Sequence, residues 1–342
     1  MVTGANSSNV SFPCDFNEHF KYILLPVSYS LVFVFGLALN CGVMYAIMFQ
    51  TRRWRAVTVY MLNLTVCDTL YVLTLPFLIY YYADENDWPF GEPLCKLVRF
   101  LFYTNLYGSI LFLSCISLQR FLGVCHPVRS LGWVGSRSAR RISAAVWLAV
   151  VSFQAPILYF SRTRQTGTGC VCHDTTSREL FPHFLAYSGV VSMLLFCVPF
   201  AVVVACYGLM LHKLLEVPPV PGSAAARSKQ RSVRTIAVVL MAFLLCFLPF
   251  HVTRSVYYSF RYLDQAVGCE LLAASNAAYK ATRPLASANS CLDPILYFMA
   301  GRGFRWSVTV ISERQRDRSR QGDRGRDRGT EAGSERQGDR GR

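Results

Sequence analysis

The chain has 342 residues, of which 53% are hydrophobic and only 16% charged, and its mean hydropathy is +0.30. This composition excludes an ordinary soluble domain. The formal net charge of +15 could indicate a nucleic-acid-binding protein, but most of the basic residues flank apolar segments. That pattern is typical of membrane topology, so we expect no nucleic-acid partner.

Apolar segments long enough to cross a hydrocarbon core of about 30 Å recur along the chain. We predict an all-α membrane protein, a seven-transmembrane helix bundle in contact with membrane lipids. The expected spans are residues 22–49, 57–82, 94–125, 139–160, 181–211, 233–260 and 271–300. Residues 1–21 are an N-terminal tail, 22–304 the seven-helix domain, and 305–342 a basic, low-complexity tail expected to be disordered. We see no cleavable signal peptide, so the first span should serve as a signal anchor.

Basic residues predict which connections face the cytoplasm. The first connection reads TRRWR, and the third, the fifth and the C-terminal tail are basic as well. The positive-inside rule therefore places the C-terminus in the cytoplasm and the N-terminus outside. The outer tail carries N-glycosylation sequons at Asn6 and Asn9, which we expect to be modified, whereas a sequon at Asn63 lies inside the second span.

Five of the thirteen cysteines lie on the predicted outer side, where an oxidising environment favours disulfides. They are Cys14, Cys95, Cys170, Cys172 and Cys269, and the sequence alone does not fix their pairing. No group has the ligand spacing of a metal site. We find no Walker-type loop, nucleophile elbow or carboxylate pair, so we do not expect an enzyme.

Three arginines on three spans are predicted to lie at one depth, near the outer face. At 1.5 Å of rise per residue, Arg254 lies roughly 30 Å and Arg283 roughly 25 Å from the inner ends of their spans, and Arg99 lies at the outer mouth of the third. His251 and Lys280 precede Arg254 and Arg283 by three residues, so each pair shares a helical face.

Together these three arginines, His251 and Lys280 would form a cationic cup. Tyr103 and Tyr107 follow Arg99 on its helical face and would line this cup. The spans supply no carboxylate at that depth, so an anionic ligand is the expected counter-charge. The planar fork of arginine suits phosphate, and several such groups indicate a polyphosphate. The alternative is that these cations snorkel to the interface; Lys280 is the first candidate, or it could pair with Asp174 or Glu270.

Motifs in several spans indicate a family. LNLTVCD with Asp68, ISLQRFLGVCHP with Arg120, CFLP and DPILY together resemble rhodopsin-like G-protein-coupled receptors. Two departures are Gln119, where an acidic residue usually precedes the arginine, and Asp293, where an asparagine usually precedes the proline. The first departure should loosen the usual ionic restraint on Arg120.

Polar residues inside spans must find partners within the bundle, because lipid offers none. Asp68, Asn40, Ser290 and Asp293 would form such a cluster if they face one another; the alternative is that they serve only in helix packing. The resemblance implies a sodium-binding pocket at Asp68, with a possible structural sodium ion and no other cofactor. It also implies that Arg120 and Tyr297 lie on the G-protein side.

The motifs LPFHVTR, VRFLFYTNLY, CHDTT and YKATRPLASANSCLDPILYF narrow the resemblance to metabotropic purinergic receptors for extracellular nucleotides, most of all the UTP- and ATP-responsive subgroup. It covers residues 14–304. It implies phosphate contacts from Arg99, His251, Arg254, Lys280 and Arg283, and sugar or base contacts from Tyr103, Tyr107, Tyr257 and Asp174. It also implies disulfides Cys95–Cys172 and Cys14–Cys269, which leave Cys170 as an extra thiol.

We therefore expect a plasma-membrane receptor for UTP and ATP that acts through a Gq-type G protein, phospholipase C and calcium release. One receptor of the subgroup has an Arg-Gly-Asp integrin motif in the second connection, but this chain reads DEND there, so we expect no integrin partner. Alternatives are a receptor for another anionic agonist, such as a nucleoside diphosphate, lipid phosphate, carboxylate or peptide, or an anion transporter or channel. We see no internal repeat of the kind that transporters usually have.

Overall fold

The computed structural model describes residues 18–51, 54–126, 135–166, 169–173, 176–177, 179–216, 224–263 and 267–300. The helices lie within one compact unit, Met1–Met299, apart from the last residue of the final helix. The predicted positions Asn6, Asn9, Cys14 and Asp174 and the tail 305–342 lie outside the described residues.

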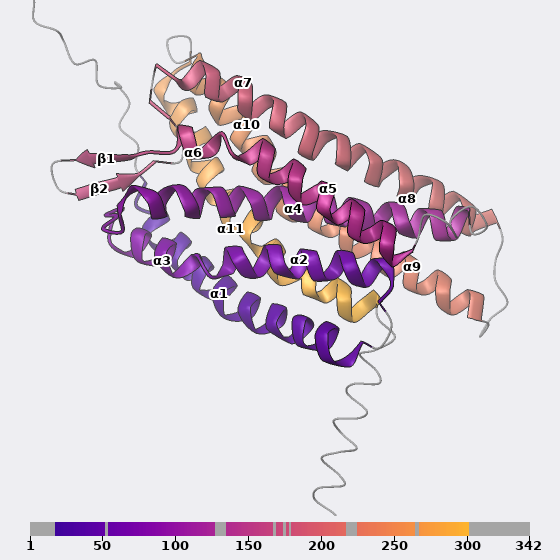
Figure 1. Cartoon of the computed structure of the whole chain (residues 1–342). Coiled ribbons are helices and arrows are strands. Elements are labelled where there is room, and N and C mark those ends of the chain that lie inside the picture. Colours follow the sequence, from indigo (N-terminus) through magenta and orange to yellow (C-terminus); the bar gives the residue numbers. More distant parts are fainter. Residues whose placement is uncertain are drawn as a thin grey trace, which may run out of the picture. The chain divides into compact units, whose positions relative to one another are not determined.

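The helices run side by side as a bundle, with a short hairpin at one end (Figure 1). Their bounds are α1 Lys21–Tyr45, α2 Ala56–Val72, α3 Leu75–Ala83, α4 Gly91–Cys125, α5 Ser136–Gln154, α6 Ile157–Phe160, α7 Phe181–Ser192, α8 Val198–Glu216, α9 Ala224–Met241, α10 Leu248–Tyr262 and α11 Cys269–Ala300. Strands β1 Thr163–Thr166 and β2 Gly169–Cys172 pair antiparallel, with Thr163 opposite Cys172. We call this the hairpin end of the bundle.

The predicted spans agree with these helices to within a few residues, except that α9 begins at Ala224, before the predicted start of the sixth span at residue 233. Six stretches of the described chain are long and apolar enough to cross a membrane: Lys21–Gln50, Ala56–Ala83, Gly91–Cys125, Ser136–Phe160, Phe181–Lys213 and Val233–Tyr262. The seventh, α11, has 32 residues, which is also sufficient length, but its sequence is more polar. Its buried charged and amide side chains contribute to the site described below.

Prolines explain why several spans consist of two helices. Pro76 lies in the first turn of α3 and separates it from α2, and Pro249 lies in the first turn of α10. A proline lacks the N–H of a helical hydrogen bond and clashes with the carbonyl four residues before it. The backbone before Pro249 widens into a π-helical turn, Ala242–Phe247, and another such turn, Met193–Cys197, precedes α8. The sixth span is therefore irregular immediately before the site.

Helix α4 is the centre of the bundle and packs against α2, α5 and α8. It approaches α2 closely at Gly108, where an added Cβ atom would lie 2.8 Å from the sulfur of Cys67. A larger residue there would force the two helices apart. This close packing fixes the position of α4, which carries Arg99, Tyr103 and Tyr107 toward the hairpin end.

Candidate functional site

The three predicted arginines come together at the hairpin end from α4, α10 and α11. Arg99, Arg254 and Arg283 have exposed fractions of only 6%, 3% and 4%. All three guanidinium groups lie close enough to Tyr103 to interact with it electrostatically. Buried charges of one sign in so small a region repel one another and lose hydration, so the arrangement favours an anionic partner.

Arg254 is held by aromatic side chains. Its Nη1 donates a hydrogen bond to the Tyr107 hydroxyl at 3.1 Å, and its guanidinium carbon lies 4.8 Å from the ring centroid of Tyr103 and 5.3 Å from that of Tyr258. Within the described ranges, Arg254 has no carboxylate partner. Cation–π contacts and one hydroxyl orient this guanidinium but do not neutralise its charge.

Arg283 is held in the same manner on α11. It donates to the hydroxyls of Tyr82 at 2.9 Å and of Tyr279 at 3.0 Å, and its guanidinium carbon lies 4.7 Å from the ring centroid of Tyr279. Arg99 instead donates to the backbone carbonyl of Cys172 at 3.1 Å, which connects α4 to the hairpin. The arginines thus have tyrosine hydroxyls and a carbonyl as partners, and these weak acceptors can share a guanidinium with a stronger anion.

His251 lies one turn before Arg254 and is buried against aromatic rings. Its imidazole stacks on Phe196 with centroids 4.0 Å apart and planes 10° apart, and it lies 5.5 Å from the ring of Tyr107. Neither ring nitrogen has a hydrogen-bond partner among the residues that the structure describes. His251 is therefore a buried side chain next to the arginine cluster, and one of its ring nitrogens could bind a ligand oxygen.

The remaining tyrosines form the wall of the cup. Tyr103 and Tyr107 stack along α4 with centroids 6.5 Å apart, and Tyr257 stacks on Tyr279 at 5.6 Å. Sequence reasoning identified all of these except Tyr279, although its position four residues before Arg283 could have predicted it. It also missed Tyr82, Tyr258 and Phe196, for which the sequence carries no comparable signal.

Lys280 corrects one expectation. It forms an ion pair with Glu18, which precedes α1, and not the predicted pair with Glu270. The other predicted partner, Asp174, lies outside the described residues. Lys280 is thus neutralised by a carboxylate of the chain, as the alternative allowed, but by a different one. Sequence reasoning considered the spans and the outer loops, whereas Glu18 reaches Lys280 from the N-terminal tail.

His173, which lies outside the spans, is surrounded by positive charges. Burial lowers the pKa of His173, which follows β2, and the charges of Arg164, Arg261, Arg99 and Lys280 lower it further. These positive charges come from the hairpin, α10, α4 and α11. The surroundings of His173 are therefore positively charged and would attract anions.

A disulfide fastens the hairpin to the bundle. Cys95 on α4 and Cys172 at the end of β2 are bonded, with their Cα atoms 5.8 Å apart, which confirms that predicted pair. Cys269 is also disulfide-bonded, whereas its predicted partner Cys14 lies outside the described residues. Cys170 is a free thiol, as expected, and its backbone N–H donates to Asp87 at 2.9 Å.

The predicted polar cluster lies at the middle of the bundle. Asn105 donates to Asp68 at 2.7 Å, Ser290 donates to Asn105 at 3.4 Å, and Asn40 donates to the backbone carbonyl of Ser290 at 2.8 Å. Asp293 is buried nearby and interacts electrostatically with Asp68. Asn105 is the member that sequence reasoning missed.

The predicted G-protein side is only partly described. Arg120 is half-buried near the end of α4, and one turn before it Ser117 shares a hydrogen bond of 2.5 Å with the Tyr207 hydroxyl of α8. Tyr297 lies in α11, but its side chain is outside the described part of the chain. Its role stays a prediction.

Comparison with known proteins identifies the class of this fold. Residues 39–297 match the family model described as "7 transmembrane receptor (rhodopsin family)". The chain is 57% identical to purinoceptor 2 of Rattus norvegicus over 293 residues, which are 86% of this chain and 78% of the relative. It is 53% identical to purinoceptor 4 of Homo sapiens over 305 residues (89% and 82%), and 40% identical to purinoceptor 3 of Gallus gallus over 320 residues (93% and 97%).

The chain is therefore a multi-pass membrane receptor of the rhodopsin family, and the expected all-α bundle is confirmed. Within that family it belongs to the seven-helix purinoceptors, which also confirms that it is not an enzyme.

Proposed function

We propose that the chain is a plasma-membrane receptor activated by the extracellular nucleotides UTP and ATP. The observation that carries this proposal is the buried cluster of Arg99, Arg254 and Arg283, whose fractional exposures are all 6% or less. Arginine binds phosphate through two parallel, charge-assisted hydrogen bonds. Three guanidinium groups suit a chain of phosphates, and the tyrosine wall suits a ribose and a base.

We propose that the hairpin end faces the cell exterior. The Cys95–Cys172 disulfide supports this orientation, because such bonds persist in oxidising compartments. Arg55, Arg137, Arg140 and Arg141, near the starts of α2 and α5 at the opposite end, support it as well. Nucleotides released from cells would then reach the cup directly, and the N-terminus would be extracellular.

For the mechanism, we propose a shift of an existing equilibrium. A nucleotide that binds Arg254 on α10 and Arg283 on α11 at once would bind more tightly when the two helices lie closer together. The π-helical turn Ala242–Phe247 and Pro249 make the sixth span adjustable immediately before Arg254. Movement there would change the opposite end of the span, where Arg120 and Tyr297 are expected to face a Gq-type G protein that activates phospholipase C.

A sodium ion in the polar cluster is a further part of the proposal. One oxygen of Asp68 and both carboxylate oxygens of Asp293 accept no hydrogen bond from any described residue. Two buried carboxylates close together repel each other, and a small cation would remove that repulsion. Their hard oxygen atoms, with Ser290 and Asn40 beside them, fit such an ion.

The test is a calcium response in cells that express the chain, challenged in turn with UTP, ATP, UDP and ADP. We expect responses to UTP and ATP that need phospholipase C and are absent from untransfected cells. Responses to a lipid phosphate, a carboxylate or a peptide, with none to nucleotides, would instead favour another anionic agonist. Uptake of labelled nucleotide into vesicles would indicate a transporter.

A further inference from the structure

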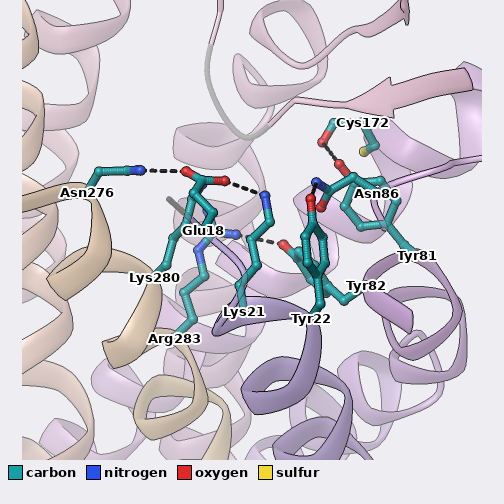
Figure 2. Close-up of polar contacts among 10 residues, drawn as sticks. All are labelled: Glu18, Lys21, Tyr22, Tyr81, Tyr82, Asn86, Cys172, Asn276, Lys280 and Arg283. Carbon is teal, nitrogen blue, oxygen red and sulfur yellow. Dashed lines mark hydrogen bonds and ion pairs between the residues drawn. The ribbon is translucent and has the colours of Figure 1, made fainter. Parts of the chain in front are cut away.

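Glu18 occupies a position among cations that the proposed function does not use. Its carboxylate forms ion pairs with Lys21 on α1 and Lys280 on α11, and it accepts a hydrogen bond of 2.6 Å from Asn276 (Figure 2). The Glu18 and Lys280 side chains are only 18% and 17% exposed. Glu18 therefore bridges the first and seventh spans at the hairpin end.

The carboxylate is ionised under all physiological conditions. Burial raises the pKa of Glu18, but the charge of Lys280 and the contacts with Lys21 outweigh it and lower that pKa to about 2. Glu18 is thus a permanent negative charge beside two lysines, and the group of three has a net charge of +1 instead of the +2 of the lysines alone.

Lys280 lies next to the site where phosphate is expected. It is three residues from Arg283 on α11, so the two side chains share a helical face, and Figure 2 shows them side by side below Glu18. A phosphate chain that binds Arg283 would come near Lys280. Its ammonium group is already paired with Glu18, so any phosphate there competes with a carboxylate of the receptor itself.

We propose that Glu18 is a specificity-determining residue of the nucleotide site: it is an internal counter-ion that keeps Lys280 from the phosphate chain and weakens binding of the most highly charged nucleotides. This inference rests on the proposed function. Glu18 has this role because it neutralises Lys280, which lies about one helical turn from Arg283 of the cup. A longer phosphate chain extends farther toward Lys280 and meets Glu18 as a competitor for its ammonium group, so the effect of Glu18 should grow with phosphate number.

The test compares Glu18→Gln with a matched control. Glutamine keeps the shape of the side chain and can still accept the Asn276 hydrogen bond, but it lacks the charge. Glu92→Gln removes an equal charge from an exposed ion pair with Lys96, at the same end of the bundle. Concentration–response curves for UTP and UDP are measured for each variant, together with the amount of receptor at the cell surface.

We expect Glu18→Gln to lower the half-maximal concentration of UTP by about fivefold, which is the size of effect expected when one partly screened charge is removed. The half-maximal concentration of UDP should fall by a smaller factor. Glu92→Gln should change neither. In a Lys280→Gln background the Glu18→Gln change should lose most of its effect, because the cation that it unmasks is gone. Equal shifts for UTP and UDP, or none, would overturn the proposal.

Two results would have other causes and are distinguished as follows: a variant that fails to reach the cell surface, and a wild-type receptor that does not respond to nucleotides. If Glu18→Gln does not reach the cell surface, Glu18→Asp is measured instead: its shorter reach weakens the ion pair, so a smaller shift in the same direction supports the proposal and an unchanged UTP to UDP ratio overturns it. A wild-type receptor that responds to no nucleotide would refute the proposed function itself, which is a different result from an unchanged ratio.

Discussion

Replacement of Arg254 by alanine is the sharpest test of a single side chain. Arg254 is 3% exposed, and its described contacts are the Tyr107 hydroxyl and the aromatic rings around it. In the proposed complex it gives two charge-assisted hydrogen bonds to phosphate, each worth about 1.5–3 kcal/mol. A loss of about 3 kcal/mol corresponds to roughly a hundredfold higher half-maximal concentration of UTP.

Two further variants separate charge from geometry. Arg254→Lys keeps the charge but loses the planar fork and its stacking, so we expect about a tenfold increase. Arg162→Ala is the matched control, because Arg162 is an exposed arginine next to the hairpin whose guanidinium carbon lies 5.8 Å from the ring of Tyr159. It should change the response by less than about twofold.

The assay is calcium release against UTP concentration, corrected for receptor at the cell surface. Wild-type potency in Arg254→Ala, with normal surface expression, would refute the reasoning that a buried, aromatic-held guanidinium binds phosphate. Equal losses in Arg254→Ala and Arg162→Ala would refute it as well, because the effect would then follow net charge and not the site.

Three more predictions concern other parts of the structure. Cys95→Ser removes the bond to Cys172 and frees the hairpin, so thermal stability should fall by about 2–5 kcal/mol with weaker UTP responses; unchanged melting of the purified receptor would contradict this. Asp68→Asn should abolish the influence of sodium on UTP potency, measured in sodium against choline buffer, and a retained sodium effect would place the ion elsewhere. The pKa of Glu18 falls from its ordinary value of 4.5 to about 2, so its stabilisation is complete above 4.5 and is lost only as pH falls toward 2. The difference in melting temperature between wild type and Glu18→Gln should thus be nearly equal at pH 7 and pH 5.5, and a clear change between them would contradict the ion pairs.

The sequence predicted the helices well because length and apolarity are local properties. The common depth of Arg99, Arg254 and Arg283 followed from the rise of 1.5 Å per residue and the positions of the span ends. What remained hidden depends on contacts between distant segments. Glu18 lies 262 residues from Lys280 along the chain, and Tyr82 lies 201 residues from Arg283.

Local irregularities were only partly predictable. Pro249 indicated a break in the sixth span, but the π-helical turn before it depends on packing that single-span reasoning does not include. The hairpin of β1 and β2 was not predicted either, because strands of four residues carry almost no periodic signal. The π-helical turn and the hairpin both lie next to the arginine cluster. The sequence therefore predicted the charged residues of the site better than the backbone around them.

Direct binding of labelled UTP to the purified receptor in lipid nanodiscs is the decisive measurement, since it needs neither a G protein nor a cellular response. We predict saturable binding to the wild type that is displaced by unlabelled UTP and lost in the Arg254→Ala/Arg283→Ala double variant, with the Arg162→Ala control unaffected. Wild-type affinity in a correctly folded double variant would contradict the assignment of the arginine cluster as the phosphate site.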